Sequence, residues 1–353
     1  MCSSDVRLFC FDAKKSVNVI GLEKSFVIKK IVKFINFDRS KSSMQRKTIF
    51  TVITIAIIAG GAFAGGYLSN HTAPSNTTSS SSQIQVVAAE NFWGSLISQL
   101  GGTHTSVLSI VSDPNADPHE YESNSFDARA IADASLVIVN GAGYDTWALQ
   151  LIAASSTPHQ VVLNVQELIN QSVGANPHFW YSPYYVNDTV KAMYKDLVSI
   201  DPTNAAYYKQ QYAALNVSLG AYNARIDEIK QQFGGTKVAS TESIFVYLAN
   251  ATGLDLVSPP AFMEAVSEGN PPTTPSVVQF DKLIQNGTVT VLVYNNQTVT
   301  LDTQSIETLA SDKGIPIVGI TETIKPPDLA FQVWMNSELI ALQNALSAQA
   351  RGK

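Results

Sequence analysis

His119 and His178 stand out because each ends the same kind of tripeptide, Asp-Pro-His in one case and Asn-Pro-His in the other, in a chain with only 5 histidines. Proline fixes its own φ and pushes the residue before it into an extended conformation, so each imidazole leaves a stiff segment. Neutral imidazole is the commonest metal ligand among protein side chains. The pair therefore indicates a metal site, although two unrelated surface turns would produce the same pattern.

Composition narrows the class of protein that could carry such a site. The 353 residues are too many for one small core, so two domains after an N-terminal segment are expected. The net charge of -6 argues against nucleic acid and against an anionic membrane surface as partners. Both cysteines, Cys2 and Cys10, lie near the start, so the rest of the chain offers neither a disulfide framework nor a thiolate metal site.

The N-terminal part predicts export from the cytoplasm. An uncharged, mostly apolar run over 48–68 is long enough to cross a bilayer, Arg46 and Lys47 precede it, and the next charge is Glu90. This asymmetry keeps the N-terminal side in the cytoplasm and places the rest outside, anchored to the cell membrane or secreted. A transmembrane anchor and a cleaved signal both fit the run. Residues 1–47 are then a cytoplasmic extension or a misassigned start, with Met44 as the other candidate start.

Residues 69–83 are rich in Ser, Thr and Asn and cannot bury a core, so they are expected to form a flexible linker. Sequons for N-glycosylation recur along the chain and fit an outward-facing protein. They begin at Asn70, Asn76, Asn170, Asn187, Asn216, Asn250, Asn286 and Asn296.

The body of the chain reads as two α/β lobes with parallel sheets flanked by helices, because short apolar runs alternate with helical patterns. Beyond Pro202, apolar and aromatic residues recur at three- and four-residue spacing, which predicts one long helix. The expected division is an N-terminal lobe at 84–201, a linking helix at 202–233 and a C-terminal lobe at 234–353. Strands are expected at 84–89, 107–111, 136–139, 237–240, 289–294 and 315–320. Helices are expected at 92–100, 126–133, 188–199, 244–251, 280–285, 303–312 and 331–348.

Four stretches of this body resemble the metal-binding (zinc/manganese) solute-binding proteins of ABC importers, the cluster A-I family. Asp-Pro-His-Glu-Tyr-Glu from position 117 and the segment 127–141, which ends in Leu-Val-Ile-Val-Asn-Gly, resemble motifs of its first lobe. Asn-Pro-His-Phe-Trp-Tyr-Ser-Pro from position 176 and Asp-Pro-Thr-Asn from position 201 resemble its next two motifs. The resemblance implies two α/β lobes joined by one long rigid backbone helix, with the metal in the cleft between the lobes.

The same resemblance implies two metal ligands from each lobe. His119 and His178 match the two histidines of the first lobe. Glu242 matches the third position, where the family more often has the histidine of a His-x-x-Phe-x-Tyr motif, and Glu322 matches an acidic residue after the last apolar strand. Other interpretations stay open: Glu242 could cap the following helix, Glu322 could be a solvated loop residue, and Asn295, at a strand end, is a rival to Glu322.

Two imidazoles and two carboxylates suit Zn²⁺, Mn²⁺ or Fe²⁺, and the absence of sulfur disfavours Cu⁺. A carboxylate in place of an imidazole favours harder ions, and the chain lacks the histidine-rich loop common in zinc-type members. Both observations add weight to manganese, although zinc would still bind more tightly on the Irving–Williams order.

The resemblance therefore implies a monomeric extracytoplasmic receptor, not an enzyme, that captures Mn²⁺ or Zn²⁺ and delivers it to an ABC permease and its ATPase. A metal-dependent hydrolase is one alternative, but it would need an open coordination position and a general base. A surface adhesin with a structural metal is another.

Overall fold

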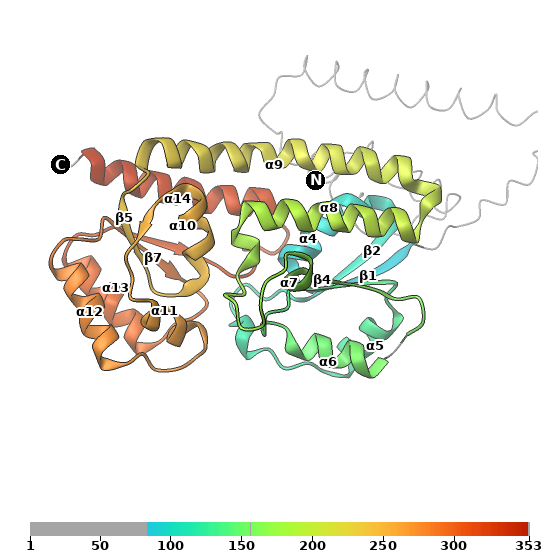
Figure 1. Cartoon of the computed structure of the whole chain (residues 1–353), viewed down its shortest axis with the longest axis horizontal. Coiled ribbons are helices and arrows are strands. Elements are labelled where there is room, and N and C mark those ends of the chain that lie inside the picture. The colour runs from blue at the N-terminus through green and yellow to red at the C-terminus, as the bar shows by residue number, and fades with distance from the viewer. Residues whose placement is uncertain (1–82, 156, 352–353) are drawn as a thin grey trace, which may run out of the picture. The chain divides into compact units, whose positions relative to one another are not determined.

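The computed structural model describes residues 83–155 and 157–351. These residues fall in one compact unit, Ser80–Lys353, in which two α/β lobes lie next to each other (Figure 1). The apolar run at 48–68, the segment before it and nearly all of the linker at 69–83 lie outside the described residues. In the part that the structure describes, no helix has the length and apolar character needed to cross a membrane.

The N-terminal lobe is built on a four-stranded parallel sheet with the order β2-β1-β3-β4. Side chains alternate between its two faces: one face packs against α4 and α8, and the other packs against α5 and α6. The apolar run of β3 is buried throughout because it is covered on both faces. The strands are β1 (Ile84–Glu90), β2 (Thr105–Val111), β3 (Leu136–Val139) and β4 (Val161–Asn164). The helices are α4 (Asn91–Gly101), α5 (Ser125–Asp133), α6 (Thr146–Ser155), α7 (Val165–Leu168) and α8 (Pro183–Ile200).

The C-terminal lobe repeats this plan with a second four-stranded parallel sheet in the order β6-β5-β7-β8. One face packs against α11, α12 and α13, and the other joins the core beneath α10 and α14. The strands are β5 (Lys237–Ser240), β6 (Asp255–Leu256), β7 (Val291–Asn295) and β8 (Ile317–Ile320). The helices are α10 (Val246–Thr252), α11 (Pro260–Ser267), α12 (Thr274–Gln285), α13 (Leu301–Asp312) and α14 (Phe331–Arg351).

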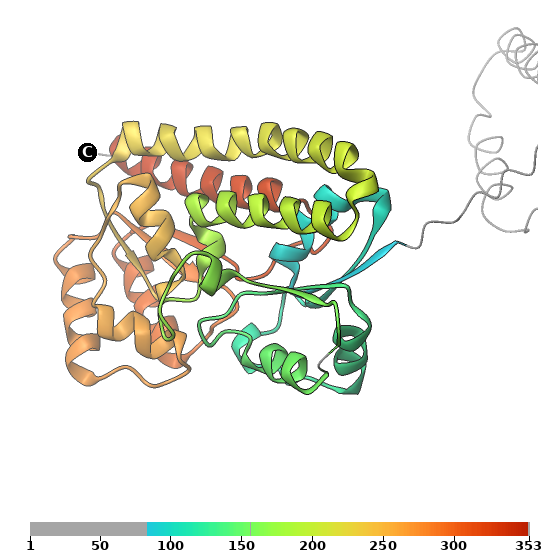
Figure 2. The ribbon, with the colours of Figure 1, turned by 45° about the vertical axis from the view of Figure 1, so that its right-hand side comes forward.

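One long helix, α9 (Ala205–Phe233), connects the lobes and follows a 3-10 turn at Pro202–Asn204. Its 29 residues span about 43 Å at 1.5 Å per residue. It lies beside α8 of the first lobe and α14 of the second, as the turned view in Figure 2 shows. The expected two-lobe fold with parallel sheets and one long connecting helix is therefore confirmed.

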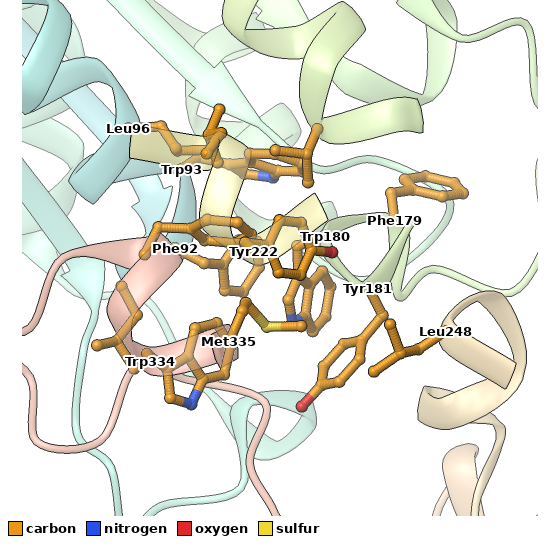
Figure 3. Packing of buried hydrophobic residues seen from close by; sticks show 14 of the residues in the cluster. Phe92, Trp93, Leu96, Phe179, Trp180, Tyr181, Tyr222, Leu248, Trp334 and Met335 are labelled. Carbon is orange, nitrogen blue, oxygen red and sulfur yellow. The ribbon is translucent and has the colours of Figure 1, made fainter. Parts of the chain in front are cut away.

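The lobes share a continuous aromatic core beneath the long helices. Phe92 stacks on Trp180 with ring centroids 3.9 Å apart, and Tyr181 packs edge-on against Trp334 of α14 (Figure 3). These four side chains are almost completely buried and belong to a single cluster that spans both lobes. Because close-packed interiors resist deformation, this shared core limits how far the lobes can move apart.

Each expected strand and helix has a counterpart in the structure, but α8 and α12 begin earlier than expected. Each has a proline in its first turn, where the missing N–H costs nothing, and a capping hydroxyl, from Ser182 or Thr273, before it. Three short elements were missed: β4 is a partly exposed edge strand, β6 has only 2 residues, and α11 begins at a Pro-Pro pair that resembles a loop. Helix α6 and the single turn of α7 were missed as well.

Candidate metal centre

The structure brings His119, His178, Glu242 and Glu322 together, so that one ligand atom from each lies within 4.8 Å of the others. The two carboxylates stand two residues beyond the ends of β5 and β8, and the two histidines lie in the connections that follow β2 and β4. Since the carboxyl ends of parallel strands meet at one edge of a sheet, the two sheets present these side chains to the same space between the lobes.

Imidazole nitrogens and carboxylate oxygens face each other around this space. His178 Nε2 lies 3.2 Å from Glu242 Oε1 and 4.0 Å from Glu322 Oε2. His119 Nε2 lies 3.4 Å from Glu322 Oε2. Two nitrogens and two oxygens thus point at a common centre, without any sulfur, which is a donor set suited to Zn²⁺, Mn²⁺ or Fe²⁺.

Two of these four atoms are unpaired in the part of the chain that the structure describes. His178 Nε2 and Glu242 Oε1 are both buried and have no hydrogen-bond partner among the described residues. Leaving a buried polar atom unpaired costs about 1–3 kcal/mol. A cation between them would satisfy both atoms, so the donor set fits a bound metal ion.

One of the four candidate ligands is less buried than the other three. His178, Glu242 and Glu322 have exposed fractions of 0%, whereas the His119 side chain is 23% exposed. His119 sits in the 3-10 turn Pro118–Glu120, where the Asp117 carboxylate accepts a hydrogen bond of 2.9 Å from its backbone N–H. The His119 side is therefore the side from which an ion can reach the centre.

A neighbouring amide fixes the tautomer of His178. Asn176 Oδ1 lies 2.7 Å from His178 Nδ1, and the Asn176 NH₂ group donates to the carbonyl oxygen of Ser243 at 2.7 Å. Because the amide oxygen can only accept, the imidazole proton sits on Nδ1, and the Nε2 lone pair faces the centre. The same amide ties the first lobe to the turn that carries Glu242.

The charges in the site shift two pKa values in directions that suit metal binding. Burial raises the pKa of Glu242, but the neighbouring imidazoles of His178 and His119 and the amide of Asn295 outweigh it and hold the pKa below its usual range. Burial lowers the pKa of His119, but the charges of Glu322, Glu242 and Asp117 outweigh it and raise the pKa. Glu242 is therefore ionised at neutral pH, and protons would compete with any metal at His119 as the pH falls.

Residues 86–345 match the protein family described as zinc-uptake complex component A, periplasmic. The chain belongs to this family. The manganese-binding lipoprotein MntA of Halalkalibacterium halodurans is 26% identical over 280 residues, which cover 76% of this chain and 86% of that protein. The resemblance inferred from the sequence motifs is thus confirmed.

Solved structures show the same fold. The periplasmic zinc-binding protein TroA of Treponema pallidum superposes with a TM-score of 0.65 at 16% identity, over 75% of this chain and 99% of that one. A mutant of the laminin-binding adhesin of Streptococcus agalactiae superposes with a TM-score of 0.63 at 17% identity, over 74% and 99%. At these identities the likeness concerns the fold alone, which this family shares with a laminin-binding adhesin.

Two of the other interpretations of the sequence are wrong. Glu242 stands at the N-cap of the turn Ser243–Phe245, but its side chain makes no capping hydrogen bond and faces His178 instead. Glu322 is not a solvated loop residue, because it is completely buried.

Asn295, the rival to Glu322, lies beside the four residues rather than in place of one. Its Oδ1, the atom that could bind a metal, accepts a hydrogen bond of 3.0 Å from the backbone N–H of Gln297. Its NH₂ group donates to Glu242 Oε2 and to Glu322 Oε1.

Tyr144 is a member of the site that the sequence motifs did not reveal. Its hydroxyl donates to Glu322 Oε2 at 2.6 Å, across the space between the lobes. Tyr144 follows β3 through a Gly-Ala-Gly turn, at the same sheet edge as the other site residues. A search of every strand's carboxyl end for polar side chains would have found it.

Proposed function

We propose that the chain is an extracytoplasmic receptor that captures a divalent transition metal ion, Mn²⁺ or Zn²⁺, and delivers it to an ABC permease. The observation that carries the proposal is the set of two imidazoles and two carboxylates drawn from both lobes, with two of its ligand atoms buried and unpaired. Membership of a zinc-uptake family and likeness to a manganese-binding lipoprotein support the same function.

In this proposal His119, His178, Glu242 and Glu322 are the metal ligands. The two carboxylates balance the double charge of the ion, so the filled site is close to neutral although it is buried. The imidazoles bind through Nε2, which the Nδ1–H hydrogen bond to Asn176 frees in the case of His178. No bond is made or broken in the cargo, and the receptor only binds and releases it.

The fold limits how the receptor responds to the ion. Each lobe supplies two ligands, so an ion bound by all four ties the lobes together. The long helix α9 and the shared aromatic core resist a wide hinge motion. The lobes therefore settle around the ion by small shifts, and the partly exposed His119 edge is the entrance.

The geometry favours a carrier over the two alternatives. Catalytic zinc sites keep three protein ligands and an open fourth position, whereas four protein ligands fill a tetrahedral shell here. A purely structural metal needs no accessible ligand, so the exposed edge of His119 favours an exchangeable ion over the adhesin interpretation. The shared fold with a laminin-binding adhesin does not distinguish the two.

Exposure of the glycosylation sequons supports a position outside the cytoplasm. The sequon asparagines within the described residues are all exposed: Asn170, Asn187, Asn216, Asn250, Asn286 and Asn296. The bulky glycans that such sequons accept could be attached at these positions without disturbing the core.

Membrane attachment, the permease and its ATPase complete the proposal. The relative MntA is named as a lipoprotein. In this chain Cys2 and Cys10 both precede the apolar run at 48–68, so no cysteine after the run could carry a lipid. The run itself, as a retained anchor, is the tether that we propose.

The test is thermal unfolding of the metal-free full-length chain with and without ion. An ion that binds only the folded state at one hundred times its Kd stabilises it by about 2.7 kcal/mol. Zn²⁺ and Mn²⁺ should therefore raise the melting temperature of the wild type and of the control His159→Ala, whose histidine is exposed in the turn before β4. They should not raise that of His178→Ala. If neither ion changes the melting temperature of the wild type, the proposed receptor function is wrong.

A further inference from the structure

Each carboxylate of the site has one oxygen that faces the imidazoles and one that faces Asn295. Glu242 turns its unpaired Oε1 toward His178, and its Oε2 accepts a hydrogen bond from the Asn295 amide. Glu322 turns Oε2 toward His119, and its Oε1 accepts from the same amide at 2.7 Å. A single NH₂ group thus donates to the far oxygen of each carboxylate, the one that faces away from the imidazoles.

The strand order explains why one side chain can reach both acids. In the C-terminal sheet β7 lies between β5 and β8, so the last residue of β7, Asn295, lies between the residues that follow the two neighbouring strands. Those residues are Glu242 and Glu322. The arrangement follows from the topology of the sheet and not from a flexible loop.

The orientation of the Asn295 amide is fixed from both ends. Its Oδ1 accepts from the backbone N–H of Gln297 at 3.0 Å, so the NH₂ group must face the carboxylates. The NH₂ group also donates to the Thr298 hydroxyl at 3.0 Å, and that hydroxyl donates to Glu322 Oε1 at 3.3 Å. Asn295 is completely buried, so water cannot take the place of either carboxylate as an acceptor.

The two hydrogen bonds from the Asn295 NH₂ group to Glu242 and Glu322, here called the clamp, restrict how the carboxylates can bind an ion. A carboxylate that chelates a metal turns both oxygens toward it, so its far oxygen would have to turn away from the Asn295 NH₂ group and break a buried hydrogen bond. With the clamp in place, Glu242 offers only Oε1 and Glu322 only Oε2. The Tyr144 hydroxyl, at 2.6 Å, already uses part of the accepting capacity of that Oε2. Together with the two imidazole nitrogens, the site then provides four donor atoms.

We infer, on the basis of the proposed receptor function, that Asn295 is a specificity-determining residue that keeps the bound ion four-coordinate. Zn²⁺ in proteins is typically tetrahedral with four ligands, whereas Mn²⁺ favours octahedral, oxygen-rich sites. The clamp therefore selects Zn²⁺ over Mn²⁺. This preference opposes the shift toward manganese that two carboxylates alone would produce.

The experiment compares Asn295→Leu, which keeps a similar volume and removes the NH₂ group, with Asn295→Ala, which also opens space. Asn344→Leu is the matched control, because Asn344 is exposed on α14. Affinities for Zn²⁺ and Mn²⁺ are measured by titration of the metal-free full-length chain. Co²⁺ serves as a spectroscopic probe, because four-coordinate Co²⁺ absorbs visible light far more strongly than six-coordinate Co²⁺.

The expected result is that both Asn295 variants lower the ratio of Zn²⁺ to Mn²⁺ affinity by about tenfold, in the range typical for residues that hold metal ligands. The strong Co²⁺ bands of the wild type should weaken in the variants and stay unchanged in Asn344→Leu. An unchanged ratio, an equal loss for both ions, or a six-coordinate Co²⁺ spectrum in the wild type would overturn the inference. A wild type that binds neither Zn²⁺ nor Mn²⁺ would instead overturn the receptor function itself.

Discussion

The two halves of the proposed metal centre hold their candidate ligands in different ways. In the N-terminal lobe, the residue two positions before each histidine positions it: Asp117 bonds to the backbone of His119, and Asn176 bonds to the ring of His178. In the C-terminal lobe, the carboxylates are held by residues far away in the sequence. Asn295 bonds to both Glu242 and Glu322.

This difference determines how many of the four candidate ligands a single substitution affects. A local turn positions one imidazole, so its loss should weaken one ligand and leave the coordination geometry of the others in place. The C-terminal network is shared, since one amide bonds to both carboxylates. Loss of a shared residue should therefore change the kind of coordination, and with it the choice of ion, rather than affinity alone.

The largest expected effect in this comparison is the loss of a C-terminal ligand. Glu242→Ala should weaken Zn²⁺ and Mn²⁺ binding by more than about 100-fold, beyond the range reported for residues that only support a ligand. Glu242→His should keep Zn²⁺ and lose Mn²⁺, because imidazole suits the softer ion and carboxylate the harder one. Competition titration against a chromophoric chelator measures both affinities.

Glu268→Ala is the control for this prediction, because that carboxylate is exposed at the end of α11. Unaltered affinities in Glu242→Ala would exclude Glu242 as a ligand and leave a water in its place.

A smaller effect is expected in the N-terminal half from Asn176→Ala. This variant frees Nδ1 of His178 and removes the bond to the Ser243 carbonyl, so it should lower affinity by about 10- to 100-fold. The loss should be similar for Zn²⁺ and Mn²⁺, because the four donor atoms stay the same. Isothermal titration calorimetry on Asn176→Ala and on the exposed control Asn270→Ala measures this. A changed ion preference would mean that loss of a positioning residue in the N-terminal lobe also alters the coordination, as is expected only for the C-terminal lobe.

The same difference explains what the sequence could predict. The strands and the long helix follow from apolar periodicity, and the histidine turns are visible because a proline stands directly before each histidine. Glu242 and Glu322 came from the family resemblance, since nothing beside them in the sequence marks a ligand. The bond from Tyr144 and the two bonds from Asn295 depend on strand order and lobe packing, which no local pattern reveals.

Behind Glu322, a buried contact between the lobes supports the loop that carries it. The Tyr181 hydroxyl lies 2.7 Å from Glu338 Oε2 and 2.8 Å from the carbonyl oxygen of Thr321. Glu338 Oε1 in turn accepts from the backbone N–H of Thr321 at 2.9 Å. This contact fixes the peptide just before Glu322.

Burial raises the pKa of Glu338 to about 7, although the hydrogen bonds from Tyr181 and Thr321 lower it. Since this pKa lies above the usual glutamate pKa of 4.5, the folded state binds the proton more tightly than the unfolded state. The contribution of Glu338 to the free energy of unfolding is therefore complete below pH 4.5 and is lost as the pH rises through about 7.

Tyr181→Phe tests this contact and should produce the smallest effect of the series. A hydrogen bond to a neutral group contributes about 1 kcal/mol and one to a charged group about 1.5–3 kcal/mol. The variant should thus lose about 1 kcal/mol of stability at low pH, where Glu338 is protonated, and about 2 kcal/mol at high pH, where Glu338 is ionised. Urea unfolding at a pH on either side of the Glu338 pKa measures both losses, with Tyr184→Phe as the control because Tyr184 is 68% exposed. Equal losses at the two pH values would mean that the hydroxyl does not stabilise an ionised Glu338, and the contact would then hold the Glu322 loop by packing alone.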